Sequence, residues 1–131
     1  MAHVSDILDA KGHDVLRIDG SATVLDAVKS MVEGNVGALI VTSQAPEGAC
    51  VTGIVTDRDL VIDVLARGLD GSNIKVGQLA SDKLASVSED ADVQAAIATM
   101  EARGVRRALV TDGENHVVGM LSLDDLMDEC A

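Results

Sequence analysis

The sequence contains no phenylalanine, tyrosine or tryptophan, and this absence excludes one common mode of recognition. Single-stranded nucleic acids bind by stacking their bases on aromatic rings, and this chain has no ring to offer. The chain has 131 residues, of which 47% are hydrophobic, enough for one compact domain. Its core must therefore be built from valine, leucine, isoleucine, methionine and alanine.

Basic residues are also scarce, with 10 Lys and Arg against 22 Asp and Glu, and the net charge is −12. Such a surface repels nucleic acid polymers and anionic membranes, so we expect neither as a partner. One small phosphate ligand stays compatible with this charge, because a single arginine can dominate inside a pocket. Half of the arginines lie close together, at Arg103, Arg106 and Arg107.

Long hydrophobic runs and a secretory signal are missing as well. Runs such as Ala38–Val41 are far shorter than the ~20 residues that a membrane span needs. The N-terminus has no basic segment followed by an apolar stretch. Cys50 and Cys130 are lone cysteines in unlike settings. We therefore expect a reduced, cytoplasmic protein.

Residues for metal binding or nucleophilic catalysis are not gathered in any motif. His3, His13 and His116 are scattered, with no cysteine or acid at ligand spacing, so we expect no metal site. Cys50 has no histidine at motif spacing, and no Ser-His-Asp arrangement is visible. The sequence does not favour an enzyme.

What the chain does contain is an internal repeat. Val24–Thr42 aligns with Val93–Thr111 at an offset of 69 residues, and Gly53–Leu60 aligns with Gly119–Leu126 at an offset of 66. Such self-similarity indicates one structural unit built twice. Because each unit is too small to bury a good core alone, we expect the two to pack together and leave a ligand cleft between them.

Hydrophobic spacing and turn residues predict an α+β fold with the order strand, helix, strand, strand, helix in each repeat. The first repeat is predicted to have strands at 15–18, 38–42 and 51–55, helices at 24–34 and 56–68, and a hairpin loop at 43–49. The second is predicted to have strands at 84–87, 108–111 and 117–121, helices at 93–103 and from 123, and a tight turn at 112–115. Short helices are predicted at 4–10 and 76–80, and a linker at 69–73.

Polar residues recur at matched corners, as Thr56-Asp-Arg-Asp59 and Ser122-Leu-Asp-Asp125, each after a strand. The spacing is typical of a helix N-cap, in which the hydroxyl accepts a backbone N–H, and such a cap stabilises by about 1 kcal/mol. The same atoms also suit a ligand. A helix N-terminus attracts phosphate, the hydroxyl can donate to it, and the acid can accept both hydroxyls of a ribose. Both interpretations stay open.

The order Gly-apolar-apolar-Thr/Ser-x-x-Asp-Leu at the end of a strand–helix–strand–strand–helix repeat, found twice, resembles a cystathionine β-synthase (CBS) domain pair. The resemblance covers nearly the whole chain and includes Asn35–Val41. It implies tandem repeats packed as a pseudo-two-fold pair, with residues 1–70 as the first repeat and its N-terminal segment and 71–131 as the second. It also implies a non-catalytic regulatory module with no required cofactor. Its ligand would be AMP, ADP or ATP, and in some members S-adenosylmethionine or NAD.

The resemblance also implies roles for particular residues. Asp59 and Asp125 would hold ribose hydroxyls, and Thr56 and Ser122 would contact phosphate or ribose. The remaining expected ligand-binding residues are Arg106, Arg107 and Arg58 near the phosphate, and Gly37, Ala38, Ile18 and Val87 around the adenine. The alternative for Arg106 is a charge-balancing strand end, and for Arg58 a solvent-facing position.

The sequence departs from the family pattern in ways that predict unequal pockets. Many members have a proline in the second strand of a repeat, where this chain has Ile40-Val41 and Leu109-Val110. The two arginines of the second repeat align with Gly37 and Ala38 in the first. One pocket is then expected to be empty or to take a different ligand.

Three functions remain to be distinguished: a nucleotide sensor, a structural or interaction protein without a small ligand, and, ranked last, an enzyme. We expect a homodimer, because the helices leave an apolar face that two repeats do not cover and because family members commonly dimerise through those helices. Since no other domain accompanies the pair, a sensor would pass its signal to an unknown protein partner.

Overall fold

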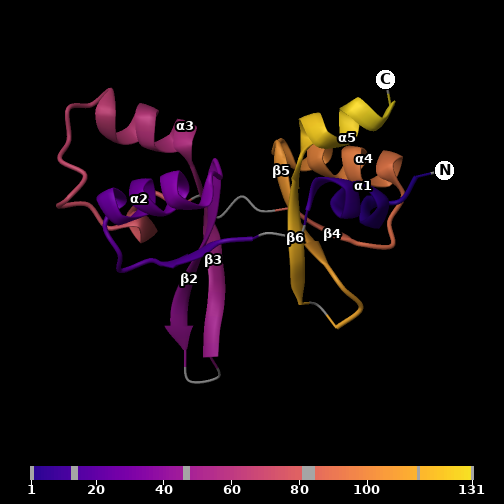
Figure 1. Cartoon of the computed structure of the whole chain (residues 1–131), viewed down its shortest axis with the longest axis horizontal. Helices are drawn as coiled ribbons and strands as arrows, with labels where there is room; N and C mark the ends of the chain where they lie inside the picture. Colours follow the sequence, from indigo (N-terminus) through magenta and orange to yellow (C-terminus); the bar gives the residue numbers. More distant parts are fainter. Residues whose placement is uncertain (1, 13–14, 46–47, 81–84, 115, 131) are drawn as a thin grey trace. The chain divides into compact units, whose positions relative to one another are not determined.

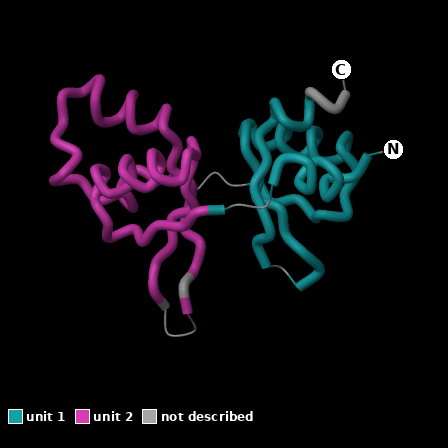
Figure 2. The backbone as a smooth tube through the Cα atoms, in the orientation of Figure 1, with its two compact units in different colours: residues 1–15, 83–131 teal, residues 16–82 magenta. Residues whose placement is uncertain are grey.

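The structure is a computed structural model and describes residues 2–12, 15–45, 48–80, 85–114 and 116–130. It divides into two compact units, residues 1–15 with 83–131 (unit 1) and residues 16–82 (unit 2), coloured separately in Figure 2. Each unit contains one three-stranded mixed sheet and its own hydrophobic core. The predicted α+β class and the repeated unit are confirmed.

Unit 2 carries most of the first repeat, on a sheet with strand order β1-β2-β3. Strand β1 pairs parallel with β2, and β2 pairs antiparallel with β3. Helix α2 is bounded by local signals: the Thr23 side chain caps its start, and Asn35 in the left-handed conformation (φ 52°) ends it. The elements of this unit are β1 (Arg17–Asp19), α2 (Val24–Gly34), β2 (Ala38–Ala45), β3 (Gly48–Thr56), α3 (Asp57–Leu60), the π-helical turn η1 (Val61–Leu65) and the 3₁₀ turn η2 (Val76–Gln78).

Unit 1 repeats this plan on a sheet with strand order β4-β5-β6. Figure 1 shows its helices gathered on one side of that sheet. Gly104 in the left-handed region (φ 67°) ends the long helix α4, as predicted. The elements of this unit are α1 (Val4–Lys11), β4 (Ala85–Ser88), α4 (Val93–Arg103), β5 (Arg107–Thr111), β6 (Val117–Ser122) and α5 (Leu123–Cys130).

A division of the chain at residue 70 would put the N-terminal segment with the first repeat and residues 71–82 with the second. In the structure, residues 1–15 belong to unit 1 with the second repeat, and residues 71–82 belong to unit 2 with the first. Residues 2–4 pair with residues 91–93 through Val4 N–H to Ala91 O (2.8 Å) and Val93 N–H to Ala2 O (3.2 Å). In the same way Val76 N–H bonds Ala22 O (2.8 Å) and Val24 N–H bonds Ile74 O (2.9 Å). Each short leading segment thus completes the unit of the other repeat.

The predicted hairpin loop at 43–49 is wrong at both ends. Strand β2 continues to Ala45 and β3 begins at Gly48, in register as Ala45↔Gly48. Backbone pairing extends a hairpin through exposed polar residues such as Ser43 and Gln44, because the ladder uses main-chain groups alone. Pro46, on which that prediction partly depended, lies outside the described residues, as does Leu84 of the predicted strand 84–87.

Candidate ligand-binding site

The strand-to-helix corner of unit 2 is a complete capping box. β3 ends at Thr56, whose backbone N–H donates to Asp59 Oδ2 (2.9 Å). The Asp59 N–H in turn donates to Thr56 Oγ1 (3.2 Å). Both residues are half-buried. The predicted N-cap is confirmed, and it satisfies donors that a helix start leaves unpaired.

The corner of unit 1 has the same geometry. Ser122 N–H donates to Asp125 Oδ2 (2.9 Å), and Asp125 N–H donates to Ser122 Oγ (3.1 Å). The registers match as well, because Thr56 lies opposite Ala38 and Ser122 lies opposite Arg107. The two corners are therefore equivalent positions of the repeated unit.

Each cap uses only one oxygen of its carboxylate. Asp59 Oδ2 and Asp125 Oδ2 accept the bonds described, while within the described residues no hydrogen bond reaches either Oδ1 atom. A carboxylate has about four acceptor positions, so a capping acid can still accept from a ligand hydroxyl. The capping role and the predicted ribose role are chemically compatible.

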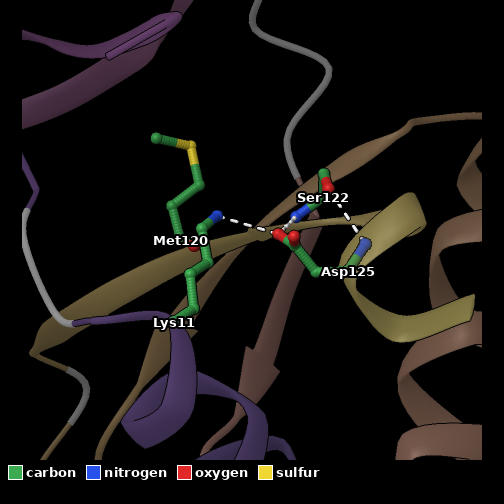
Figure 3. Close-up of polar contacts among 4 residues, drawn as sticks. All are labelled: Lys11, Met120, Ser122 and Asp125. Atoms are coloured by element: carbon green, nitrogen blue, oxygen red, sulfur yellow. Dashed lines mark hydrogen bonds and ion pairs between the residues drawn. The ribbon is translucent and has the colours of Figure 1, made fainter. Parts of the chain in front are cut away.

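Asp125 has a second contact that no sequence pattern indicates. Lys11, the last residue of α1, places Nζ 2.8 Å from Asp125 Oδ2 and 3.2 Å from Met120 O (Figure 3). The lysine side chain is 42% exposed and the aspartate side chain 28% exposed. Because α1 packs in unit 1, a cation from residue 11 reaches an acid 114 residues away.

The surroundings of Asp125 also set its acidity. Burial alone raises the pKa of this carboxyl, but the hydrogen bonds from Lys11 and from the Ser122 backbone outweigh burial and hold the pKa below its ordinary value. A carboxyl whose pKa is depressed by folding contributes stability above its unfolded-state pKa of about 3.9. That contribution is lost as the pH falls through the folded-state pKa.

Lys11→Met is therefore expected to raise the pKa of Asp125, because it removes the cation that pairs with this carboxylate and leaves the effect of burial in place. Titration of the Asp125 carboxyl carbon by NMR measures this directly. Lys29→Met, which changes an exposed lysine of unit 2, is the matched control and should leave the Asp125 pKa unchanged. An unaltered Asp125 pKa in Lys11→Met would show that the ion pair does not form in solution.

The three predicted arginines occupy unlike positions. Arg106 is exposed and pairs with Asp124 across 3.1 Å, as the charge-balancing alternative describes. Arg107 is half-buried at the start of β5, opposite Ser122, and within the described residues its side chain has no ion pair. Arg58 is exposed on α3. Arg107 is thus the arginine that the sheet register places beside a capping hydroxyl.

The predicted adenine-wall residues are mostly part of the cores. Val87 is buried in the core of unit 1, and Ile18 packs against the core of unit 2. Ala38 is buried at the start of β2. Gly37 is half-buried under the Asp57 carboxylate, whose Oδ2 would lie 3.2 Å from a Cβ at this position. In unit 1, Arg106 aligns with Gly37 and Leu123 aligns with Asp57, so this contact between a glycine and an acid has no counterpart there.

Other features of the described residues lie away from the two corners. A pocket of about 330 Å³ in unit 2 is lined by Leu16, Arg17, Ser30, Glu33 and Gly34, none of which is a predicted binding residue. No group of three or more His, Cys, Asp or Glu among these residues is placed to hold a metal ion. No helix in this part of the chain is long and apolar enough to cross a bilayer.

The structure contains the same three-stranded sheet and the same capped strand-to-helix corner twice. This repetition defines a class of protein. The family model of the CBS domain matches residues 4–65 and again residues 76–131, which together are most of the chain. The chain belongs to the CBS domain family, and it is a CBS domain pair. Modules of this kind are commonly regulatory and generally non-catalytic.

Individual relatives agree with this assignment. Hypoxic response protein 1 of Mycobacterium tuberculosis is 32% identical over 126 residues, covering 96% of this chain and 83% of that protein. The mitochondrial CBS domain-containing protein CBSX3 of Arabidopsis thaliana is 32% identical over 133 residues, covering 95% of this chain but only 62% of that protein. The solved hexameric CBS-CP12 protein from bloom-forming cyanobacteria matches with a TM-score of 0.80 and 30% identity, covering 96% of this chain and 66% of that one. The chain therefore spans less than two thirds of the length of CBSX3 and of the CBS-CP12 protein.

Proposed function

We propose that the protein is a non-catalytic regulatory module that binds an adenine nucleotide, AMP, ADP or ATP, at its strand-to-helix corners. The single observation that carries the proposal is the pair of matched corners, each with a hydroxyl, an acid and one acid oxygen outside the cap. NAD and S-adenosylmethionine contain the same adenosine unit and belong to the same proposal.

The chemistry of the corner suits a ribose. The outer oxygen of Asp59 or Asp125 would accept the two ribose hydroxyls, a bond strengthened by the negative charge of the acceptor. The half-buried Arg107 is a cation available to a phosphate beside Ser122. With no aromatic side chain in the protein, the adenine would be held by aliphatic contacts and backbone hydrogen bonds, so we expect modest affinity.

The regulatory output would follow from a shift between conformations. A ligand moves such an equilibrium only by the difference between its affinities for the two states. We propose that the nucleotide favours one arrangement of the repeats or of a homodimer, and that a protein partner recognises that arrangement. The hexameric CBS-CP12 protein supports self-association, because its similarity covers 96% of this chain.

Thermal unfolding in the presence of AMP, ADP, ATP, NAD and S-adenosylmethionine tests the proposal. A ligand that binds only the folded state stabilises it by about 2.7 kcal/mol at a concentration of 100 times Kd, so the midpoint should rise with ligand concentration. Inorganic phosphate is the matched control for charge alone. A midpoint that none of the nucleotides raises beyond the phosphate control would contradict the proposal.

A structural or interaction protein without a small ligand is the second candidate. Two observations favour it: both caps are complete without a ligand, and Lys11 already contacts the Asp125 carboxylate. Under this alternative, substitution of either acid lowers stability and changes no binding.

A further inference from the structure

The two strand-to-helix corners share one cap geometry but differ in the charges beside it. The four hydrogen bonds of the two caps agree in donor and acceptor. The charged residues that differ lie next to the cap, at positions that the cap does not use. They leave the fold of the corner unaltered, so they can set which ligand each corner accepts.

Cations border the capping acid of unit 1. Lys11 Nζ donates to Asp125 Oδ2 (2.8 Å) and to Met120 O (3.2 Å), as Figure 3 shows. Within the described residues these two bonds use two of the three ammonium hydrogens, and the lysine side chain is 42% exposed, so a ligand can approach it. Arg107, half-buried opposite Ser122, adds a second cation to this corner.

An additional acid borders the corner of unit 2. Asp57 follows Thr56 as the first residue of α3, and its carboxylate lies over Gly37, where Oδ2 would be 3.2 Å from a Cβ. Asp57 Oδ1 accepts the N–H of Arg58 (2.8 Å), which holds the carboxylate at the helix start. Unit 1 has the uncharged Leu123 at the aligned position. A phosphate at the unit 2 corner would therefore meet one more like charge than at the unit 1 corner.

The remaining charges do not make the two corners equal. Arg106 pairs with Asp124 across 3.1 Å, so these two charges cancel in unit 1. Arg58 is an exposed cation beside the two acids of the unit 2 corner. Lys83 aligns with Lys11 when the leading segments are matched by their backbone pairing, but it lies outside the described residues. Its charge would at most neutralise the unit 2 corner, whereas the unit 1 corner is net positive.

Charge at short range distinguishes ligands that share the adenosine unit. The 5′ group is attached to the same ribose whose hydroxyls the capping acid would accept, so it lies within the ~8 Å over which charges act at physiological salt. A phosphate is favoured beside lysine and arginine and is repelled by a second carboxylate. A neutral 5′ hydroxyl avoids that repulsion, and the sulfonium group of S-adenosylmethionine is attracted by the carboxylate.

We infer that the two corners select adenosine ligands by the charge of the 5′ group. The unit 1 corner takes phosphorylated nucleotides, and Lys11 binds the phosphate together with Arg107. The unit 2 corner prefers a ligand whose 5′ group is neutral or cationic, of the S-adenosylmethionine class, because Asp57 disfavours phosphate. The inference rests on the function proposed above and divides its ligands between the two corners.

Calorimetric titrations of the full chain with AMP, adenosine and S-adenosylmethionine test the inference. The variants D59N and D125N each disable one corner, so that the other is measured by itself. We expect D59N, which keeps the unit 1 corner, to bind AMP at least about tenfold more tightly than adenosine. We expect D125N, which keeps the unit 2 corner, to bind adenosine and S-adenosylmethionine at least about tenfold more tightly than AMP.

Single substitutions then assign the preference to particular charges. Asp57→Leu in the D125N background installs the residue of unit 1 and should raise the affinity for AMP about tenfold, with the affinity for adenosine unchanged. Lys11→Met in the D59N background should lower the ratio of AMP to adenosine affinity by a similar factor. Glu114→Gln removes one negative charge, as Asp57→Leu does, but in the turn at the far end of the β5–β6 hairpin. It is the matched control and should leave both ratios unchanged.

The outcomes separate this inference from the wider proposal. One order of affinities at both corners would overturn the division by charge while leaving nucleotide binding in place. No saturable heat for any of the three ligands with the original chain would overturn both. A ratio that Glu114→Gln shifts as far as Asp57→Leu would assign the effect to net charge and overturn the role of the corner. If circular dichroism shows that Asp57→Leu is unfolded, Asp57→Asn provides the same reading.

Discussion

Leu8→Ala is expected to lower the free energy of unfolding by about 2–5 kcal/mol, a large part of the stability of a small domain. Leu8 lies on α1 and is fully buried in the core of unit 1. It lies over Gly119 of β6, where a Cβ would come within 2.5 Å of Leu8 Cδ1. Replacing the isobutyl side chain by a methyl group leaves a cavity between a helix and a strand that the surrounding residues fill only partly.

Urea unfolding followed by circular dichroism measures the effect. Met127→Ala is the control, because this side chain is exposed in the same unit and its loss should cost less than about 0.5 kcal/mol. If Leu8→Ala is as stable as Met127→Ala, the N-terminal helix does not belong to the core of unit 1 in solution.

Asp59→Asn and Asp125→Asn, made separately, are expected to weaken AMP binding at the affected corner by about tenfold or more. Asparagine keeps an oxygen that can accept the Thr56 or Ser122 N–H, so the cap survives. The variant loses the negative charge, and hydrogen bonds to charged groups contribute about 1.5–3 kcal/mol. The free energy of unfolding should change by less than about 1 kcal/mol.

The control for this pair is Thr56→Ser, which preserves both the capping hydroxyl and the acid and should preserve binding. Calorimetric titration with AMP and unfolding in urea are run on the same samples. Variants that lose stability but bind AMP as tightly as the original chain would assign the two acids to capping alone.

Local signals predicted the parts of the fold that depend on neighbouring residues. The Thr56–Asp59 pair is an N-cap, and Gly104 ends α4, because these contacts reach only three or four residues along the chain. The internal repeat then predicted that both corners share one geometry. The match between the Thr56 and Ser122 caps confirms it.

Long-range features escaped prediction for a physical reason. Lys11 contacts Asp125 only because α1 packs in the core of the other repeat. The hydrophobic periodicity of a helix shows that one face is buried but does not show which core that face packs against. The π-helical turn Val61–Leu65 was predicted as ordinary helix, since a change of hydrogen-bond register leaves the apolar spacing nearly unaltered. The ligand roles of the corner residues stay predictions.

The most direct test of the central claim is a calorimetric titration of AMP into the purified chain, with 2′-deoxy-AMP and the double variant D59N/D125N measured alongside. The account predicts saturable binding of AMP, weaker binding of the deoxy ligand because one ribose hydroxyl is missing, and no measurable binding to the folded double variant. Absence of saturable heat for AMP, ADP and ATP at millimolar concentration would contradict it. Equal affinity of the original chain and the double variant would do the same.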